Sequence, residues 1–418
     1  MQTTHTECIY RLAAAAVAVV LITSASAWAE WTQFGGPNRD FKSPATGLST
    51  EWPEGGPKRL WSRALDGAYS GVAATSDTLF TMSRSGDEDI VVALAADSGA
   101  TKWEHRYSAP AFPGLDQSFG MAPRSTPLVL PDRVITAGIT GRLHCLDRET
   151  GKVHWSHDLM AEYGATRPRW GYSSSPLAYK NTVIVPAGGK GHGVMAFDRN
   201  SGAVVWSKHD FANAYSSPML IDVDGQEQLV VFMAPGVAGL DPATGELLWQ
   251  HPHRTDYDVN ASLPVWGEDN LLFISSDYGT GSRGLRLTRS GDRTNVEEVW
   301  QQKKMRVHFG NAIRIDDLIY GSTGGNGPVF FAAVNAKTGE FAFQHRDLFA
   351  KAQLVHADGK LIILDEDGQL CIGTPTAEGV TIHARAQLLD KVAWTAPTLV
   401  GTRLYIRDNK TIMALDLG

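Results

Sequence analysis

Residues 146–155 read LDRETGKVHW, and variants of this segment recur along the chain. Each copy has an apolar residue, a turn, a glycine, and an aromatic residue four positions after the glycine. The other clear copies are 94–103 (LAADSGATKW), 197–206 (FDRNSGAVVW), 240–249 (LDPATGELLW) and 334–343 (VNAKTGEFAF). Repetition at this spacing indicates an array of similar supersecondary units, so the repeat decides the fold.

Each unit contains several short strand patterns separated by turns, with almost no helical periodicity between the copies. In the second unit we expect strands at 127–130, 134–139, 142–147 and 152–157. Asp147 suits the last turn because its side chain can accept hydrogen bonds from backbone N–H groups two residues on. Gly151 can take the positive φ that the bend requires. Four antiparallel strands per unit, repeated, predict a β-propeller.

The turn glycines count the units. They are Gly99, Gly151, Gly202, Gly245, Gly291, Gly339 and Gly379, at steps of 40 to 52 residues. An eighth unit is split: the C-terminal end supplies strands near 405–407 and 412–416, while Lys58–Trp61 resembles an isolated fourth strand. We therefore predict an all-β, eight-bladed propeller of four-stranded antiparallel blades, closed by pairing of residues 59–65 with the C-terminal blade.

The aromatic residue of each copy falls on the outermost strand, where a large ring can pack against the neighbouring sheet. We predict this blade-docking role for Trp61, Trp103, Trp155, Trp206, Trp249, Trp300 and Phe343.

The N-terminus has the pattern of an export signal. Arg11 precedes an apolar run at 12–22, and Ala27-Trp28-Ala29 is a small-x-small cleavage pattern. We expect a signal peptide at 1–29 and one propeller domain at 30–418, in a periplasmic or secreted protein with no transmembrane segment after cleavage. An uncleaved membrane anchor is the alternative. No cysteine follows the cleavage region, so no lipid anchor is expected.

Composition narrows the possible partners. The chain has 418 residues, of which 43% are hydrophobic and 20% charged, with a net charge of −7. Nucleic acid as a partner is disfavoured, because its binding calls for a basic surface. Outside the signal segment the cysteines are Cys145 and Cys371, at the same place in two distant repeats. We expect two buried free thiols, since equivalent positions around a ring lie beyond disulfide reach.

The Leu-Asp-x-x-Thr-Gly-x-x-x-Trp copies, the Ser-Pro starts at 175–176 and 217–218, and the opening Trp31–Pro37 (WTQFGGP) resemble the pyrroloquinoline-quinone-like repeat propellers. The resemblance covers about residues 31–418. One branch of that superfamily comprises quinoprotein alcohol and sugar dehydrogenases, which hold the quinone and calcium on the axis. The other comprises non-catalytic propellers, including BamB-like outer-membrane assembly factors.

The chain departs from both branches. It has no vicinal cysteine pair, no Cys-x-x-Cys-His segment, and no Glu, Asn and Asp set that matches the calcium and base positions of the dehydrogenases. It also lacks the N-terminal lipid-anchored cysteine that is usual in BamB-like factors. The expectation is therefore a non-catalytic propeller with no cofactor and no metal. Pyrroloquinoline quinone with calcium is the alternative.

A binding site is expected where the loops entering the innermost strands open beside the axis. Alignment of those strands gives one such residue per blade, three before the Pro position: Tyr69, Arg124, Ser173, Tyr215, Ala261, His308, Lys351 and Trp394. The candidate ligand-binding residues are Tyr69, Arg124, Arg169, Tyr172, Tyr215, His308, Lys351 and Trp394. Aromatic faces interleaved with cations suit an anionic or sugar-like ligand. Alternatively, these loop residues simply face water.

A histidine also recurs after the docking residue: His105, His157, His209, His251 and His345. Equivalent positions in separate blades cannot converge on one metal ion, so packing or hydrogen bonding at the outer strand is expected.

The resulting hypothesis is an exported, monomeric, non-enzymatic binding or scaffold protein. It would bind a protein partner or a small anionic or sugar-like ligand of the cell envelope at the axial funnel. The alternative is a quinone-dependent or degenerate dehydrogenase, which needs a convergent acid/base and metal set on the axis. A seven-bladed WD-type scaffold is disfavoured, because no Asp directly follows the repeat tryptophan.

Overall fold

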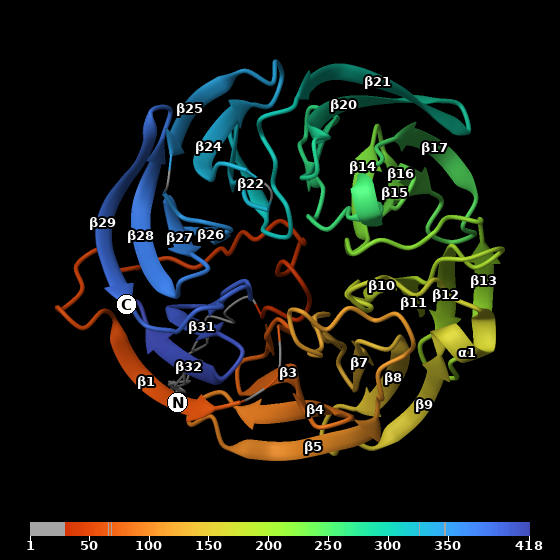
Figure 1. The fold of residues 1–418 in the computed structure, drawn as a ribbon, viewed down its shortest axis with the longest axis horizontal. Coiled ribbons are helices and arrows are strands. Elements are labelled where there is room, and N and C mark those ends of the chain that lie inside the picture. Colours follow the sequence, from red (N-terminus) through yellow and green to blue (C-terminus); the bar gives the residue numbers. More distant parts are fainter. Residues whose placement is uncertain (1–29, 66, 68, 326, 347) are drawn as a thin grey trace, which may run out of the picture.

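The computed structural model describes residues 30–65, 67, 69–325, 327–346 and 348–418. Its strands form eight four-stranded antiparallel sheets, which stand as blades around a central axis (Figure 1). In seven of them the strands follow one another along the chain. The predicted eight-bladed, all-β propeller is therefore confirmed. The predicted signal peptide, residues 1–29, lies outside the described residues.

The strands are numbered along the chain. Blade 1 holds β2 (Ala73–Ala74), β3 (Thr78–Ser85), β4 (Glu88–Ala95) and β5 (Thr101–Ser108); blade 2 holds β6 (Leu128–Val129), β7 (Arg133–Ala137), β8 (Arg142–Asp147) and β9 (Val153–Asp158). Blade 3 holds β10 (Leu177–Tyr179), β11 (Thr182–Pro186), β12 (Val194–Asp198) and β13 (Val204–Lys208); blade 4 holds β14 (Met219–Val223), β15 (Gln226–Met233), β16 (Gly236–Leu240) and β17 (Leu247–Pro252).

The second half of the ring repeats the plan. Blade 5 holds β18 (Val265–Trp266), β19 (Leu271–Ser276), β20 (Gly281–Ser290) and β21 (Arg293–Gln302); blade 6 holds β22 (Ala312–Ile315), β23 (Leu318–Ser322), β24 (Phe330–Asn335) and β25 (Phe341–Arg346). Blade 7 holds β26 (Gln353–Ala357), β27 (Lys360–Leu364), β28 (Gln369–Thr376) and β29 (Gly379–Gln387); blade 8 holds β30 (Thr398–Val400), β31 (Arg403–Arg407), β32 (Thr411–Asp416) and β1 (Lys58–Ala64). The helices are α1 (Leu159–Tyr163) and a 3-10 turn, η1 (Asp256–Asp258).

Blade 8 closes the ring. Strand β1 pairs antiparallel with β32, from Lys58 opposite Asp416 to Ala64 opposite Thr411. The predicted pairing of the two ends is therefore confirmed. The sheet edge that β32 would otherwise expose is covered by the N-terminal strand.

Hydroxyl groups join neighbouring blades close to the axis. Ser175 and Ser217, which precede the prolines of the inner strands, accept hydrogen bonds through Oγ from the preceding blade: from Thr126 N at 2.9 Å and from Ser175 N at 2.9 Å. The Ser-Pro starts are thus explained by inter-blade bonding, since an inner strand must satisfy its buried N–H groups outside its own sheet.

The outer strand of every blade carries a β-bulge, which in seven blades lies directly before the docking residue. In blade 2, Leu146 lies opposite Val153 and Cys145 lies opposite Trp155, so His154 is the extra residue. The same one-residue shift occurs in all eight blades. A bulge increases the local twist and re-aims the following side chain, which here turns the ring toward the next blade.

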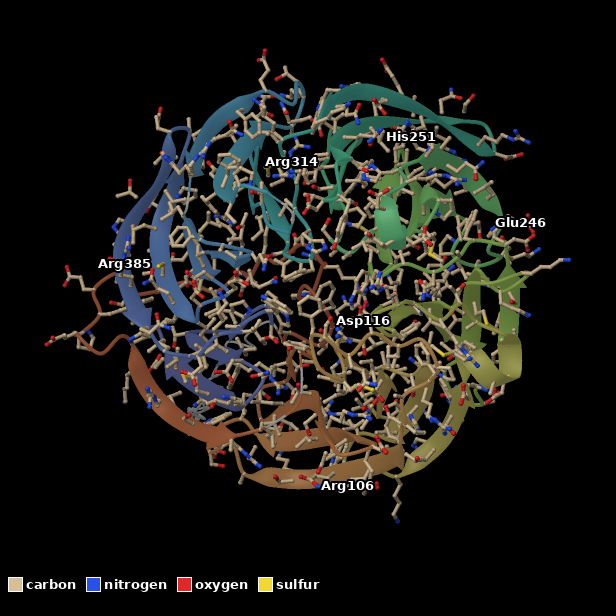
Figure 2. All side chains as sticks on the ribbon, viewed as in Figure 1. Arg106, Asp116, Glu246, His251, Arg314 and Arg385 are labelled. Carbon is tan, nitrogen blue, oxygen red and sulfur yellow. The ribbon has the colours of Figure 1, made fainter. Side chains whose placement is uncertain are left out.

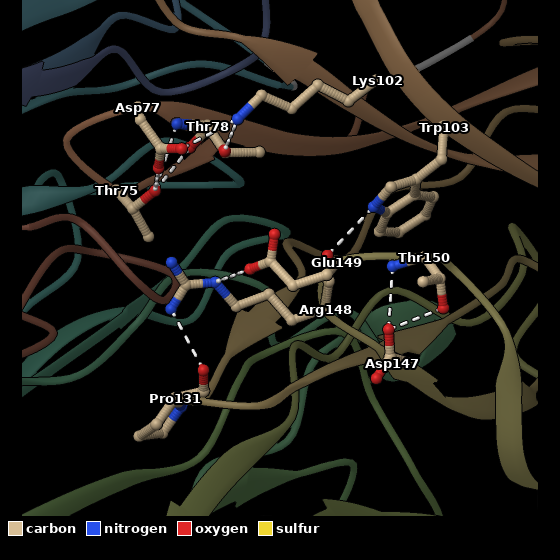
Figure 3. A network of polar contacts seen from close by, with 10 residues as sticks. All are labelled: Thr75, Asp77, Thr78, Lys102, Trp103, Pro131, Asp147, Arg148, Glu149 and Thr150. Atoms are coloured by element: carbon tan, nitrogen blue, oxygen red, sulfur yellow. Dashed lines mark hydrogen bonds and ion pairs between the residues drawn. The ribbon is translucent and has the colours of Figure 1, made fainter.

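The docking contact itself joins an indole ring to a turn glycine of the next blade. A Cβ added to Gly151 would lie 2.5 Å from Cε3 of Trp103 in blade 1. The Trp103 Nε1–H also donates to the carbonyl of Arg148 at 2.9 Å, while Asp147 accepts from the backbone N–H of Thr150 at 2.8 Å (Figure 3). The repeat glycine is therefore required twice, for its φ of +69° and for the space that the ring occupies.

Four more pairs repeat this contact: Trp61 with Gly99, Trp155 with Gly202, Trp206 with Gly245 and Trp300 with Gly339. Trp249 differs, because its Nε1–H donates to Gln228 at 2.7 Å and Gln228 in turn donates to Thr294 of blade 5 at 2.7 Å. Phe343 is buried and packs against Tyr320 and Phe331 of its own blade.

Three of the recurring histidines bond to the next blade. His157 and His209 donate through Nε2 to the carbonyls of Gly202 and Gly245 at 2.8 and 2.7 Å, and His345 to that of Glu378 at 2.9 Å. The expected hydrogen-bonding role at the outer strand is confirmed for these three.

The structure also describes the two cysteines outside the signal segment. Cys145 and Cys371 are buried free thiols, as expected. Within the described part of the chain, no helix has both the length and the apolar character needed to cross a lipid bilayer.

We expect Gly151→Ala to lower the free energy of unfolding by about 3 kcal/mol. The new methyl group must displace the Trp103 ring as well as adopt a left-handed backbone, and overpacking typically costs 1–3 kcal/mol. Gly225→Ala is the matched control, with φ +80° and nothing within 4 Å of its Cβ, and should cost about 1 kcal/mol. Urea unfolding followed by tryptophan fluorescence measures both. Equal losses would contradict the docking contact.

Candidate functional site

A cavity of about 340 Å³ opens on the propeller axis. Its mouth is lined by one residue from each blade, all at the aligned position: Tyr69, Arg124, Ser173, Tyr215, Ala261, His308, Lys351 and Trp394. Two residues further along the chain in each blade, just before or at the start of the inner strand, a second ring of residues lines the cavity: Gly71, Thr126, Ser175, Ser217, Leu263, Gly310, Gln353 and Ala396.

The N-terminal segment before β1 forms the floor. Phe34 lines the cavity, and the segment crosses the centre of the ring (Figure 1). Its backbone bonds to blade 1 through Trp31 and Ala74, to blade 2 through Thr32 and Val129 at 2.8 Å, and to blade 7 through Ser43 and His356 at 2.9 Å. Sequence reasoning missed this plug. Its one signal was the opening WTQFGGP, which lies outside the repeats.

Arg39 anchors the plug. Its side chain is 2% exposed, and its guanidinium donates to the carbonyls of Pro218, at 2.6 Å, and of Pro176. Burial lowers the pKa of Arg39 to about 9, so the group remains a cation at neutral pH. Because these carbonyls belong to blades 3 and 4, the closed end of the channel is held by long-range contacts.

Eight rings at the mouth form one connected series, which we call the aromatic collar: Tyr69, Trp170, Tyr215, Tyr257, Tyr278, His308, Phe309 and Trp394. Successive ring centroids are 4.7 to 6.3 Å apart, from Phe309 and Trp394 to Trp170 and Tyr257. Arg124 completes the series: its Cζ lies 5.7 Å from the Tyr69 centroid and its Nη1 donates to the Trp170 carbonyl at 2.6 Å.

Two cations line the cavity, and they differ in whether a carboxylate pairs with them. Lys351 pairs with Glu366 at 3.0 Å and lies 5.5 Å from the centroid of Trp394, whose Nε1–H also donates to Glu366. The hydrogen-bond acceptors of Arg124 are backbone carbonyls, and among the described residues no carboxylate pairs with it. Burial lowers the pKa of Arg124, because the charged guanidinium has lost solvent without gaining a counter-ion.

His308 is held in its neutral form. Burial is the main cause that lowers its pKa to about 4, and the Lys351 charge adds to it, while the Asp277 charge acts in the opposite direction. Its Nδ1 is buried and has no hydrogen-bond partner among the residues that the structure describes. A neutral imidazole nitrogen in this position can accept or donate a proton in a hydrogen bond to a ligand.

The structure places six of the eight predicted residues at the cavity: Tyr69, Arg124, Tyr215, His308, Lys351 and Trp394. Tyr172 is a correction: it is 1% exposed and packs in the core between blades 2 and 3. It directly precedes Ser173, which lines the cavity, so adjacent residues of the segment before β10 lie on different sides.

Arg169 also does not line the cavity. Its Cζ lies 5.0 Å from the centroid of Trp170 and 5.4 Å from that of Tyr257, and it pairs with Asp116 at 3.1 Å. Asp116 lies near the centre of the ring in Figure 2. Arg169 therefore supports the collar without lining the cavity, by cation–π contacts with two of the collar rings.

The repeat alignment missed Phe119, Trp170, Tyr278 and Phe309 among the lining residues, and Tyr257 beside them. Except for Phe309, which lies next to an aligned position, these residues come from the loops between strands, whose lengths differ from blade to blade. Their one sequence signal is an aromatic residue within a Gly- or Pro-rich loop.

Eight four-stranded blades with tryptophan–glycine docking define a β-propeller of the pyrroloquinoline-quinone-like repeat class. Within that class, the chain belongs to the family described as outer membrane protein assembly factor BamB, whose sequence pattern matches residues 87–345. No curated protein matches the chain in sequence.

Solved structures share the fold at low sequence identity. BamB from Moraxella catarrhalis is 20% identical, with a TM-score of 0.58, over 86% of this chain and 97% of that one. A quinohemoprotein alcohol dehydrogenase from Pseudomonas putida HK5 is 12% identical, with a TM-score of 0.65, over 93% and 80%. The quinohemoprotein alcohol dehydrogenase from Comamonas testosteroni is 12% identical, with a TM-score of 0.64, over 95% and 82%. These likenesses concern the fold alone.

The dehydrogenases raise the question whether a quinone and calcium would fit here. Calcium takes six to eight oxygen ligands, mostly from carboxylates and carbonyls. Among the described residues, no group of three or more His, Cys, Asp or Glu is placed to hold a metal ion. The described residues that line the cavity include the cations Arg124 and Lys351 and no carboxylate, a donor set that does not fit calcium.

Proposed function

We propose that the chain is an exported, monomeric, non-enzymatic binding protein of the cell envelope, with residues 1–29 as its signal peptide. Its axial cavity binds a small anionic ligand that contains a ring. Membership in a family described by outer-membrane assembly supports the location, and the pattern of residues 11–29 supports export.

One observation carries the proposal: the Arg124 guanidinium lines the cavity without a carboxylate partner among the described residues. A buried cation is stabilised by an anion that replaces its lost solvent, and charge-assisted hydrogen bonds are the strong ones. The surrounding collar offers flat apolar faces to a ring of the ligand. Lys351 contributes less, because Glu366 already neutralises it.

We expect Arg124→Gln to weaken binding of a carboxylate probe by about 10- to 100-fold, the loss expected for a charge-assisted hydrogen bond of roughly 1.5–3 kcal/mol. D-galacturonate, benzoate and inorganic phosphate are titrated at low ionic strength and followed by tryptophan fluorescence, because Trp170 and Trp394 line the cavity.

Arg106→Gln is the matched control. Arg106 lies on the outer strand β5 at the rim of the ring, paired with Glu104 at 2.8 Å, and its replacement should leave affinity unchanged (Figure 2). Absence of binding by all three probes, or equal affinity in Arg124→Gln, would refute the proposal. Dye reduction with alcohols or sugars after addition of pyrroloquinoline quinone and Ca²⁺ would favour the dehydrogenase alternative instead.

A further inference from the structure

Exposed apolar side chains gather in two places on the described part of the molecule. Val153, Val204, Val205 and Leu247 lie on the outer strands of blades 2, 3 and 4. The other two are Phe119 and Tyr257, which are 50% and 61% exposed and stand at the mouth of the axial cavity. Large exposed rings beside a cavity mark a surface that a ligand covers.

The two rings come from different loops and have different neighbours. Phe119 lies 5.7 Å from Trp394 of blade 8, and its carbonyl accepts from the Tyr69 hydroxyl of blade 1 at 2.9 Å. Tyr257 follows blade 4 and lies 5.9 Å from Tyr278, which follows β19 of blade 5. Phe119 thus lies beside the entries to blades 8 and 1, and Tyr257 beside blade 5, so the two exposed rings border different parts of the mouth.

Tyr257 is held in a costly backbone conformation. Tyr257 and the next residue, Asp258, have φ of +64° and +59°, in the left-handed region that non-glycine residues rarely adopt. The Arg169 guanidinium, 5.4 Å from the ring centroid, supports the side chain from one side. Strained residues at a cavity mouth are retained where the strain serves a function, here the presentation of a rigid ring to a ligand.

Inside the cavity, polar groups alternate with rings. The Ser173 hydroxyl donates to the Tyr215 carbonyl at 3.0 Å, the Gln353 amide donates to the Trp394 carbonyl at 3.0 Å, and Thr126 adds a second hydroxyl. A flat aromatic acid has no hydroxyl with which to bond these groups. A sugar ring offers hydroxyls to them and C–H faces to the collar.

Building on the proposed function, we propose that the ligand is an acidic saccharide. One uronic-acid ring lies in the cavity with its carboxylate on Arg124, and the next sugar units of the same chain lie between Phe119 and Tyr257. The cation sets the charge of the ligand, the polar groups set its hydroxylated ring, and the two exposed rings set its extension beyond one unit.

The test compares chain lengths. D-Galacturonate, its α-1,4-linked trimer, benzoate and the neutral maltotriose are titrated into wild-type protein and the variants Phe119→Ala and Tyr257→Asn. Asn tolerates the left-handed conformation, so the second variant removes the ring and keeps the loop. Val205→Ala, which is 52% exposed on β13, is the matched control.

We expect the galacturonate trimer to bind wild-type protein at least tenfold more tightly than the monomer, and each ring variant to lose about five- to tenfold for the trimer but not for the monomer. Equal affinity for trimer and monomer, tighter binding of benzoate or maltotriose than of the trimer, or unchanged trimer affinity in both variants would overturn the inference. If monomeric anions still bind through Arg124, the proposed function stands without it. If no anion binds, both fail.

Discussion

Replacing Arg407 by Met is expected to lower the free energy of unfolding by at least about 3 kcal/mol. The Arg407 side chain is fully buried in β31 of the closing blade. Its guanidinium donates to Thr81 Oγ1 at 3.0 Å and to the Met82 carbonyl at 3.1 Å in blade 1, and to the Leu65 carbonyl at 3.1 Å just after β1. One side chain therefore joins both ends of the ring.

The size of the effect follows from what the substitution leaves behind. Methionine fills most of the volume but cannot donate, so three buried acceptors lose their partner, and each unsatisfied group costs about 1–3 kcal/mol. Relief of the buried charge offsets part of this cost. Burial lowers the pKa of Arg407 to about 10, so the group is still charged at neutral pH.

Arg385→Met is the matched control, because Arg385 is exposed on the outer strand β29, and it should change stability by less than about 0.5 kcal/mol (Figure 2). Urea unfolding gives the stabilities, and hydrogen exchange of the β1 amides reports on the closure directly. If Arg407→Met leaves both unchanged, closure does not depend on this contact.

Acidification from pH 7.5 to 5 is expected to destabilise the fold by about 4 kcal/mol through two buried histidines. Burial lowers the pKa of His144 and of His253 to about 3. In the unfolded chain an imidazole has a pKa near 6.5, so between about pH 6.5 and 3 the unfolded state binds protons that the folded state does not. Stability therefore falls as pH falls through this window, by about 1.4 kcal/mol per pH unit for each group.

The contacts of the two histidines explain the preference for the neutral form. His253 is 1% exposed, and Arg283 Nη1 lies 3.2 Å from its Nδ1, which must accept that bond and so carries no proton. His144 is 6% exposed and packs against His105 and Tyr107, with ring centroids 5.2 and 4.1 Å away. Protonation would put a second positive charge beside Arg283 in one case and an unsolvated cation in the other.

The double variant His144→Asn, His253→Asn should reduce the loss between pH 7.5 and 5 by about 4 kcal/mol, whatever its stability at pH 7.5. His308, whose pKa burial also lowers, keeps part of the pH dependence in that variant. His383→Asn, at an exposed position, should keep the slope of the wild type. Urea unfolding at pH 5, 6 and 7.5 measures the slopes. An unchanged slope in the double variant would show that other groups titrate.

The fold could be predicted from the amino-acid sequence because the features that determine it are local and repeated. The five clear copies of the LDRETGKVHW pattern each carry a turn, a glycine and an aromatic ring in one ten-residue stretch, and units repeated at this spacing stack around an axis. Blade 5 tests this reasoning: its turn at Gly291 has no docking ring within 4 Å, yet Trp300 keeps its place at the outer-strand bulge. The pattern can therefore degrade in one turn without the loss of a blade.

The candidate site could be predicted from the sequence only for residues that follow the repeat of the blades. Tyr69, Arg124 and Lys351 occupy one aligned position, so radial repetition brings them to one cavity mouth. Tyr172 shows how exact the alignment of the blades must be. A shift of one residue in the segment before β10 moves the side chain from the axis, where Ser173 lies, to the core.

The amino-acid sequence by itself determined the eight blades, the pairing of the two ends and the ring of aligned residues, because each depends on short-range spacing that recurs. Only the tertiary structure decided the plug that floors the cavity, the aromatic collar, and which of the two cations at the cavity is paired with a carboxylate. Phe34, Tyr257 and Phe119 lie in segments that do not repeat, and Arg39 contacts carbonyls of Pro176 and Pro218 more than 130 residues away. Contacts of that range leave no periodic trace in the chain, since they exist only once the ring has closed.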